Sequence, residues 1–408
     1  MDYHAAADFL SDLRRFALDP GTESIRELLA YLDDPHEGVA FVQVAGSNGK
    51  GSTARMTESI LREAGYRTGL YTSPHFDDIR ERVRVDGREI TEAAVVEFVD
   101  RVRPFLVDRA VEGDPLTSFE TLTAMSLWYF GRSDVDVAVL EVGMGGRLDA
   151  TSVVDPVAAA VTAVSLEHTE VLGDTLDDIA AEKVTVAPED APLVTGATGD
   201  SLAAVRRHAP DRYDGVVNHA EAGVALTGDD WSVETRVPLP GAYQARNAGV
   251  AATLARQVGG DRVTEAHLER GLRNAHWPGR FEVVERDPLV VLDGAHNPDA
   301  CEAVGETLAE YDYDDLHLVF GAMHDKDHRS MVEALPRAAS VRTCAPALER
   351  AADPAVLAAS FEAAGAEGTV ESAHSVAAAL DAARDAAAPD DCVLVVGSLF
   401  AVAEARRR

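Results

Sequence analysis

The chain has 408 residues, of which 46% are apolar, and its formal net charge is −33. A protein this acidic is not expected to bind nucleic acid or an anionic membrane surface. The apolar fraction excludes long disorder, and the length exceeds what one hydrophobic core usually serves, so two domains are predicted.

The amino-terminal segment is acidic and amphipathic, unlike a signal peptide, and no apolar run approaches the length of a membrane span. The cysteines, Cys301, Cys344 and Cys392, lie far apart without CxxC spacing. They indicate neither a disulfide framework nor a zinc site, and they fit a reducing compartment. We therefore expect a soluble cytoplasmic protein.

Short β-branched runs alternate with helical patterns along most of the chain, which predicts a mostly parallel sheet covered by helices on both faces. In chain order we predict a strand at 39–45, a glycine-rich loop, a helix at 52–64 and a strand at 68–72. The near-continuous apolar runs at 135–140 and 157–164 are typical of buried parallel strands. An irregular stretch at 190–240 is expected to be rich in β-structure, and a helix follows at 242–258.

A Pro-Gly pair at 278–279 breaks this pattern, so we place a domain boundary there, between domains 1–278 and 279–408. Predicted strands of the second domain are 289–292, 316–320, 341–344 and 392–396, with a helix at 376–388. The expected fold class is α/β, with a P-loop-type, doubly wound, mostly parallel sheet and a second, smaller Rossmann-like α/β domain.

The glycine-rich loop at 46–52 follows a predicted strand and opens a predicted helix, as a phosphate site requires. Backbone N–H groups at a helix amino end attract phosphate oxygens, and Lys50 adds a mobile positive charge. The loop is not a standard Walker A sequence, because Val44 and Gly51 replace its Gly and Ser/Thr. This argues against a generic NTPase.

Three potential metal ligands stand at the carboxyl ends of predicted strands, namely Ser73, Glu141 and His168. In a doubly wound sheet those ends line the crevice where ligands bind. A hydroxyl, a carboxylate and an imidazole beside phosphate oxygens suit Mg²⁺, which keeps few protein ligands. Taken singly, Ser73 also fits a turn before proline, and His168 fits an ordinary loop histidine.

Only three of the 37 basic residues are lysines, at positions 50, 183 and 326. The excess of acidic residues and the scarcity of lysine suggest adaptation to high salt, although a GC-rich genome would also favour arginine. Lysine is a compact point charge whose amine can be modified, whereas arginine is a fixed planar fork. The lysines that remain are therefore expected to have roles that arginine cannot fill.

Several ordered motifs now resemble one family. Gly46-Ser-Asn-Gly-Lys-Gly-Ser52 is similar to the ATP loop of the Mur ligase superfamily. Thr72-Ser-Pro-His75, Leu140-Glu-Val-Gly-Met-Gly-Gly-Arg-Leu-Asp-Ala150, Glu167-His-Thr169, Pro278-Gly-Arg-Phe281 and Leu292-Asp-Gly-Ala-His-Asn-Pro298 resemble its bifunctional folylpolyglutamate synthase/dihydrofolate synthase branch. The resemblance extends from about residue 18 to the carboxyl terminus.

The resemblance implies a role for each matching residue. ATP phosphates are assigned to Ser47, Asn48, Gly49, Lys50, Gly51 and Ser52, and further nucleotide contacts to Asn247, Arg280 and Asp293. Magnesium, expected as two ions, is assigned to Ser73, Glu141, His168 and Lys183. The pterin substrate is assigned to Asp19, Pro20, Gly21, Thr117, Ser118, Phe119, Glu120, Leu148, Asp149 and Ala150. Lys50, Lys183 and His296 form the implied catalytic set, although Asp293 to His296 also fit a strand-to-helix turn with Asp and Asn as caps.

Lys183 matches a lysine that this family carbamylates. CO₂ adds to a neutral primary amine and converts it into an anionic magnesium ligand, which arginine could not become. The chain departs from the family in two places. Val184-Thr185-Val186 replaces Ala-Gly-Ile after the lysine, and Tyr243-Gln244 replaces His-Gln before Asn247.

The implied activity is ATP-dependent ligation of L-glutamate to dihydropteroate, and to reduced folates, through an acyl phosphate. The expected partners are these small molecules, with no nucleic acid or membrane, and a monomer is expected. Folylpolyglutamate synthase activity alone, or another Mur-type ligase acting on a different carboxylate, remains an alternative.

Two further alternatives are weaker. A cell-wall Mur ligase needs a UDP-binding domain, and only about 38 residues precede the first predicted strand. A nucleotide-switch ATPase needs neither an acceptor site nor the second domain with its own Asp-Gly-Ala-His-Asn-Pro turn.

Overall fold

The computed structural model describes residues 1–13, 21–209, 213–214, 217–220, 223–228 and 230–408. The chain divides into two compact units. The first comprises Met1–Pro238 and Ala245–Ala275, and the second comprises Leu239–Gln244 and His276–Arg408. The domain boundary expected after residue 278 stays a prediction.

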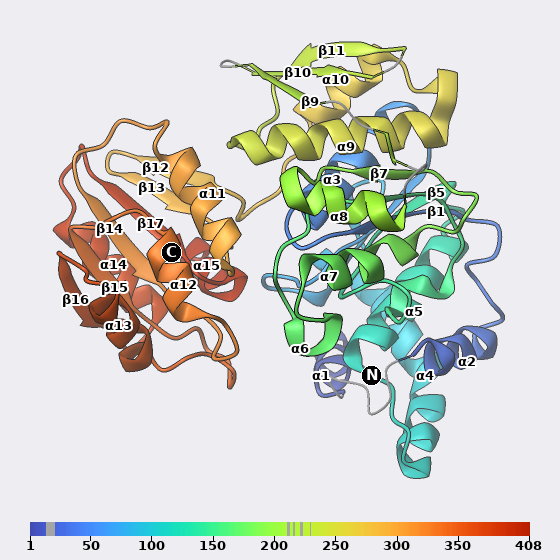
Figure 1. Cartoon of the computed structure of the whole chain (residues 1–408). Coiled ribbons are helices and arrows are strands. Elements are labelled where there is room, and N and C mark those ends of the chain that lie inside the picture. The colour runs from blue at the N-terminus through green and yellow to red at the C-terminus, as the bar shows by residue number, and fades with distance from the viewer. Residues whose placement is uncertain (14–20, 210–212, 215–216, 221–222, 229) are drawn as a thin grey trace. The chain divides into compact units, whose positions relative to one another are not determined.

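The first unit is built on a mostly parallel sheet (Figure 1). Within the described ranges its strand order is β4-β3-β2-β5-β1-β6-β7-β8, and the antiparallel neighbours are β2–β3 and β3–β4. The strands are β1 (Ala40–Ala45), β2 (Thr68–Tyr71), β3 (Val83–Val85), β4 (Arg88–Glu89), β5 (Val137–Glu141), β6 (Pro156–Val161), β7 (Leu193–Thr195) and β8 (Tyr213–Asp214). Because β2, β5, β1 and β6 are parallel neighbours, their carboxyl ends and the loops that follow lie along one edge.

Two apolar layers cover the sheet of the first unit. One core cluster joins it to α1 (Tyr3–Ser11), α2 (Glu23–Tyr31), α4 (Glu92–Glu112) and α5 (Ser118–Arg132). Another cluster joins β6 and β7 to α7 (Leu176–Lys183), α8 (Gly199–His208) and the 3₁₀ turn η3 (Val184–Val186). The short helix α6 (Thr169–Leu172) follows β6 and the 3₁₀ turn η1 (Ile79–Arg82) follows β2, whereas the 3₁₀ turn η2 (Ala150–Val153) lies in the loop between β5 and β6.

Helix α3 (Lys50–Glu63) packs on β1, β2 and β5, and α10 (Glu265–Arg273) packs on α3. A small antiparallel sheet of β9 (Val217–Ala220), β10 (Gly223–Thr227) and β11 (Ser232–Thr235) lies beside α10 (Figure 1). Helix α9 (Ala242–Gly259) and the 3₁₀ turn η4 (Gly260–Arg262) precede α10 in the chain.

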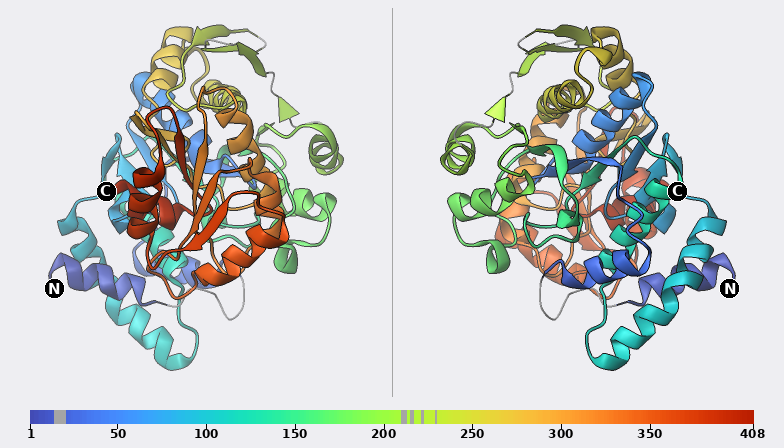
Figure 2. Two further views of the ribbon diagram at one scale, coloured as in Figure 1. Left: turned by 90° about the vertical axis from the view of Figure 1, so that its left-hand side faces the viewer. Right: turned by 90° about the vertical axis from the view of Figure 1, so that its right-hand side faces the viewer.

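The second unit has a sheet of its own, with the order β12-β13-β17-β14-β15-β16. All neighbours are parallel except β12 and β13. Its strands are β12 (Glu282–Arg286), β13 (Leu289–Leu292), β14 (Leu316–Phe320), β15 (Ser340–Thr343), β16 (Thr369–Ser372) and β17 (Cys392–Val396). Helices α11 (Pro298–Leu308) and α12 (His328–Ala334) cover one face, and α14 (Val376–Ala386) and α15 (Leu399–Arg406) the other (Figure 2). Helix α13 (Pro354–Ala363) packs on β15 and β16.

The predicted α/β class with doubly wound parallel sheets is confirmed. Some bounds were wrong: the helix expected at 52–64 begins at Lys50, and the strand expected at 157–164 ends at Val161. The stretch 190–240 contains the expected short strands and also α8, which was not predicted. No helix in the described part of the chain is long and apolar enough to cross a membrane.

Candidate active site

The loop after β1 can approach other backbone segments closely because of two glycines. Gly46 and Gly49 have φ angles of +141° and +89°. A Cβ atom on Gly46 would lie 2.0 Å from Thr162 Oγ1, and one on Gly49 would lie 2.5 Å from Asn247 Oδ1. Any larger residue would collide with these side chains, so both glycines are required here.

Loop 46–52 is anchored to the segment that follows β6. Ser47 N donates to the Ala163 carbonyl at 2.7 Å, and Thr162 Oγ1 donates to the Asn48 carbonyl at 2.7 Å. Ser47 Oγ accepts from Ser165 N at 3.0 Å. These contacts explain why the predicted strand 157–164 stops at Val161, since the next residues leave the sheet to hold the loop.

Lys50 is the first residue of α3, and its side chain folds back over the loop. Its Nζ donates to the carbonyls of Gly46 at 2.8 Å and Ser47 at 3.2 Å. Gly51 and Ser52 lie buried in the first turn of the same helix. A long helix that presents its amino end beside an ammonium group forms an anion-binding arrangement. The residues assigned to ATP phosphates are therefore together.

Two of the predicted metal ligands come from neighbouring strands. Ser73 lies just beyond β2, and its N–H donates to Glu141 Oε2, on the last residue of β5, at 2.9 Å. His168 lies in the loop between β6 and α6, in the left-handed region with a φ of +49°. In the described part of the chain, no three His, Cys, Asp or Glu side chains form a metal site by themselves. Such a sparse oxygen and nitrogen set fits Mg²⁺, which completes its shell with water and phosphate oxygens.

Lys183, at the end of α7, is paired with Glu167, which sequence reasoning did not identify as its partner. Lys183 Nζ lies 2.9 Å from Glu167 Oε1, and only 2% of the lysine side chain is exposed. Burial raises the pKa of Glu167, but Lys50 and Lys183 outweigh this effect and hold it at about 2. For Lys183, burial outweighs the attraction of Glu167 and lowers its pKa. Electrostatics thus link Lys50, Glu167, His168 and Lys183 as one group.

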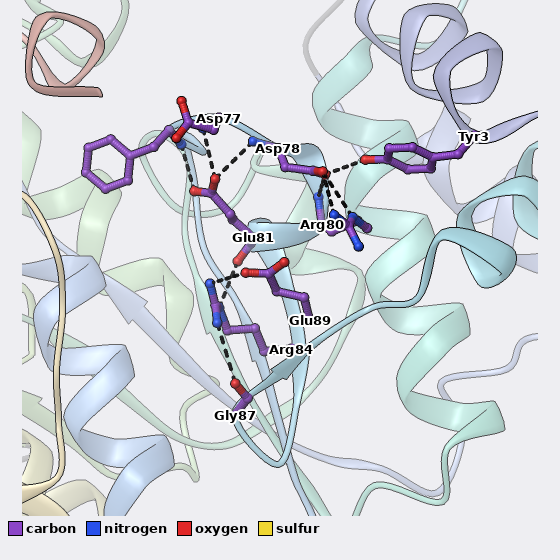
Figure 3. A network of polar contacts seen from close by, with 9 residues as sticks. Tyr3, Asp77, Asp78, Arg80, Glu81, Arg84, Gly87 and Glu89 are labelled. Atoms are coloured by element: carbon purple, nitrogen blue, oxygen red, sulfur yellow. Dashed lines mark hydrogen bonds and ion pairs between the residues drawn. The ribbon is translucent and has the colours of Figure 1, made fainter. Parts of the chain in front are cut away.

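The loop after Ser73 is held by one carboxylate. Glu81 accepts the backbone N–H groups of Phe76, Asp77 and Asp78 at 2.8–2.9 Å (Figure 3). Asp78 in turn binds the hydroxyl of Tyr3, on α1, and the guanidinium of Arg80 (Figure 3). This network fixes the loop beyond a predicted metal ligand, and no local sequence pattern indicated it.

Two of the three segments assigned to the pterin substrate, 117–120 and 148–150, meet at Gly143. A Cβ atom on Gly143 would lie 2.5 Å from Phe119 Cζ and 3.0 Å from Asp149 Oδ2. Ala150 begins η2, which packs on α5, and Leu148 is exposed. Gly21 is described, whereas Asp19 and Pro20 lie outside the described residues.

Several of the polar side chains in these segments are engaged within the protein. Thr117 and Glu120 form a capping box at the start of α5, which opens with Ser118. Asp149 accepts N–H groups of Met144 and Thr151 at 2.9 Å, and burial raises its pKa. These carboxylates shape the loops, and Phe119 and Leu148 supply apolar surface.

The second unit holds Arg280, Asp293 and His296 near the end of β13. Asp293 accepts from Phe281 N at 2.6 Å and Ala295 N at 2.7 Å, and burial raises its pKa to about 6 despite the nearby Arg280. His296 Nδ1 lies 2.9 Å from the Gly294 carbonyl, and Asn297 caps α11. Residues 293–297 thus form the strand-to-helix turn that was the alternative interpretation of this segment. The assignment of Arg280 and Asp293 to nucleotide binding stays a prediction. Asn247 lies in the first unit, on α9.

Comparison with known families gives two matches. Residues 44–255 match the Mur ligase middle domain, and residues 279–399 match the glutamate ligase domain of Mur ligases.

Among curated proteins, the chain is 62% identical to a probable bifunctional folylpolyglutamate synthase/dihydropteroate synthase of Haloferax volcanii, covering 100% of this chain and 50% of that protein. A Halobacterium salinarum protein of the same name is 60% identical, with coverage of 100% and 52%. The chain thus spans about half the length of these two relatives. The dihydrofolate synthase/folylpolyglutamate synthase of Escherichia coli is 36% identical over 97% of this chain and 92% of that protein.

The chain also resembles solved structures of folylpolyglutamate synthases. A Mycobacterium tuberculosis folylpolyglutamate synthase complexed with ADP has a TM-score of 0.90 at 30% identity, covering 100% of this chain and 98% of that one. E. coli FolC in complex with DHPP and ADP has a TM-score of 0.87 at 31% identity, with coverage of 100% and 99%. A Yersinia pestis bifunctional synthase complexed with AMPPNP and Mn ion has a TM-score of 0.86 at 30% identity, with coverage of 100% and 98%. The matches to halophile proteins agree with the predicted adaptation to salt. The chain therefore belongs to the folylpolyglutamate synthase/dihydrofolate synthase family of Mur ligases.

Proposed function

We propose that this chain is an ATP-dependent amide ligase that joins L-glutamate to dihydropteroate and to reduced folates. The observation that carries the proposal is the group of charges at the carboxyl edge of the first sheet. There the phosphate-type loop with Lys50 lies within electrostatic reach of Glu167, Lys183 and His168. The relatives named as dihydrofolate and folylpolyglutamate synthases supply the substrate class.

The reaction proceeds in two steps. The terminal phosphoryl group of ATP moves to an oxygen of the acceptor carboxylate, and ADP leaves. The amine nitrogen of glutamate then attacks the acyl carbon, phosphate leaves, the amine loses a proton and an amide bond remains. Both steps depend on positioning and on neutralising negative charge, which Lys50 and the amino end of α3 supply.

We assign ATP binding to loop 46–52, with nucleotide contacts from Asn247, Arg280 and Asp293. Structures of relatives with ADP, and with AMPPNP and Mn ion, support ATP and a divalent metal. Ser73, Glu141 and His168 would hold magnesium, expected as two ions, which when bound neutralises phosphate charge. The contact between Ser73 N–H and Glu141 supports this assignment because it brings two ligands from different strands together.

We further propose that Lys183 is carbamylated in the working enzyme. Its neutral amine forms a bond to the carbon of CO₂ and loses a proton, which leaves an anionic carbamate. Burial of Lys183 favours this reaction because it stabilises the neutral amine. The ion pair with Glu167 belongs to the unmodified lysine, so the carbamate must form at the expense of this pair.

For the acceptor, we propose the surface formed by Phe119 and loop 143–150. An aromatic ring beside glycine backbone suits a flat heterocycle such as a pterin. The E. coli relative solved with DHPP and ADP supports an acceptor of this class. We also propose that the protein acts in the cytoplasm as a monomer.

The test is an assay at molar salt with ATP, magnesium, glutamate and either dihydropteroate or tetrahydrofolate. We expect ADP release that requires both glutamate and a pteroate, and a product one glutamate heavier by mass spectrometry. ADP release without either co-substrate would contradict the proposal. Activity with tetrahydrofolate alone would restrict the enzyme to the folylpolyglutamate synthase reaction.

A further inference from the structure

The segment after Lys183, Val184-Thr185-Val186, connects the end of α7 to loop 143–150. Val184 and Val186 are buried in the core cluster that contains α7 and α8, whereas Thr185 between them is exposed. The alternation directs the two valines inward and leaves the threonine hydroxyl free to make contacts at the surface.

The hydroxyl of Thr185 joins two distant segments. It donates to the Glu182 carbonyl at 2.7 Å, in the last turn of α7, and accepts the Arg147 N–H at 2.8 Å. A glycine at this position would have no side chain to make either bond. In this chain, therefore, loop 143–150 is hydrogen-bonded to the end of the helix that carries Lys183.

Steric evidence independent of this hydroxyl shows the same close approach. A Cβ atom on Gly146 would lie 2.3 Å from the Glu182 carbonyl oxygen. The Gly146 carbonyl in turn accepts from Asp149 N at 2.9 Å and Ser152 Oγ at 2.7 Å. Hydrogen bonds thus connect Thr185, through Arg147 and Gly146, to the turn around Asp149. The side chain of Asp149 lies beside Gly143, as that of Phe119 does.

We infer that Thr185 is a positioning residue for the carboxylate acceptor, because it sets the place of loop 143–150 relative to the helix end that bears Lys183. The inference rests on the proposed function, which assigns this loop to the acceptor. Without the hydroxyl, Arg147 N–H loses its partner and the loop samples positions away from α7. A loop that samples several positions must be ordered again when the acceptor binds, and this cost weakens binding and raises the acceptor KM.

The experiment compares Thr185→Val, which keeps the shape and removes the hydroxyl, with Thr185→Ser, which retains the hydroxyl. The matched control is Thr175→Val. Thr175 caps the opposite end of α7 by accepting from Asp178 N, so its loss weakens the helix without touching the loop.

For Thr185→Val we expect the acceptor KM to rise about fivefold to tenfold, as the loss of one net hydrogen bond implies, with the ATP KM unchanged. Amide hydrogen exchange in peptides covering 143–150 should become faster. Thr185→Ser should stay within about twofold of the parent in both measurements, and Thr175→Val should leave exchange in 143–150 unaltered.

Unchanged exchange and acceptor KM in Thr185→Val would overturn the inference, as would an equal effect of Thr175→Val. An equal rise of the ATP and acceptor KM values would also contradict it. If the parent protein glutamylates no pteroate, the proposed function fails and so does the role assigned to the acceptor. The exchange measurement would then still report whether Thr185 holds the loop, so the two failures are distinguishable.

Discussion

Lys183 and Glu167 form a buried ion pair, with Nζ 2.9 Å from Oε1, in the first unit of the protein. The lysine is the residue expected to react with CO₂, and the carboxylate is its partner while it is still an ammonium group. A buried pair is costly to break from one side because the remaining charge keeps no partner. Substitutions of Lys183 and of Glu167 therefore test whether Lys183 is an ammonium group or a carbamate.

Lys183→Ala should lose ligase activity, and acetate or formate should partly restore it by occupying the space of the carbamate. Lys183→Arg should stay inactive, because it keeps the positive charge and cannot react with CO₂. Rates with and without formate, and carbamate detection by NMR after labelling with ¹³C-bicarbonate, test this. An active arginine variant with no response to carboxylates would point to an ordinary structural lysine.

Glu167→Gln should destabilise the ligand-free protein by about 3 kcal/mol near neutral pH, since it removes the partner that offsets the burial of the Lys183 ammonium. The pKa of Glu167 is depressed from 4.5 to about 2, so its contribution is present above 4.5 and is lost as the pH falls toward 2. The difference between parent and variant should therefore shrink over that range.

Denaturant unfolding at several pH values, without magnesium or nucleotide, measures this dependence. Asp177→Asn is the control, because Asp177 forms an exposed pair with Arg207 and surface pairs contribute little. A difference that stays constant from neutral pH to pH 2 would show that Glu167 does not titrate in this way.

Lys50→Arg should lower the ligation rate by about 10²–10³-fold while the thermal unfolding midpoint stays near that of the parent. The ammonium donates to the Gly46 and Ser47 carbonyls within a tight loop, and a planar guanidinium is too bulky to take the same place. Steady-state kinetics and a melting curve on the same preparation check this. Near-normal turnover by the folded variant would exclude Lys50 from the phosphate site.

Glu141→Ala and His168→Ala should each shift the magnesium midpoint of the reaction at least about tenfold upward. Both residues stand at the carboxyl edge, and Glu141 also holds the Ser73 N–H. Titration of Mg²⁺ against rate measures the shift, with Glu189→Ala, an exposed carboxylate in another loop, as the control. If both variants keep the parent's midpoint and maximum rate, the metal binds elsewhere.

Much of the fold could be predicted from local patterns. The predicted bounds of β13, β14 and β17 match the observed ones, because a strand buried on both faces is apolar along almost its whole length. The hairpin β3–β4 and the antiparallel edge strand β12 were missed. Such edge strands are short and partly exposed, so they lack a continuous apolar signal.

The candidate site divides in the same way. The phosphate-binding loop at 46–52 could be predicted from the sequence, because Gly, Lys and hydroxyl residues between a strand and a helix form a local pattern. It also singled out Lys183 as a lysine that arginine had not replaced. The folded structure was needed to show that Glu167 pairs with that lysine, that Phe119 and Asp149 approach each other at Gly143, and that Thr185 accepts a hydrogen bond from Arg147. These contacts join segments that lie far apart in the chain, and they depend on sheet order and loop path, which no local pattern encodes.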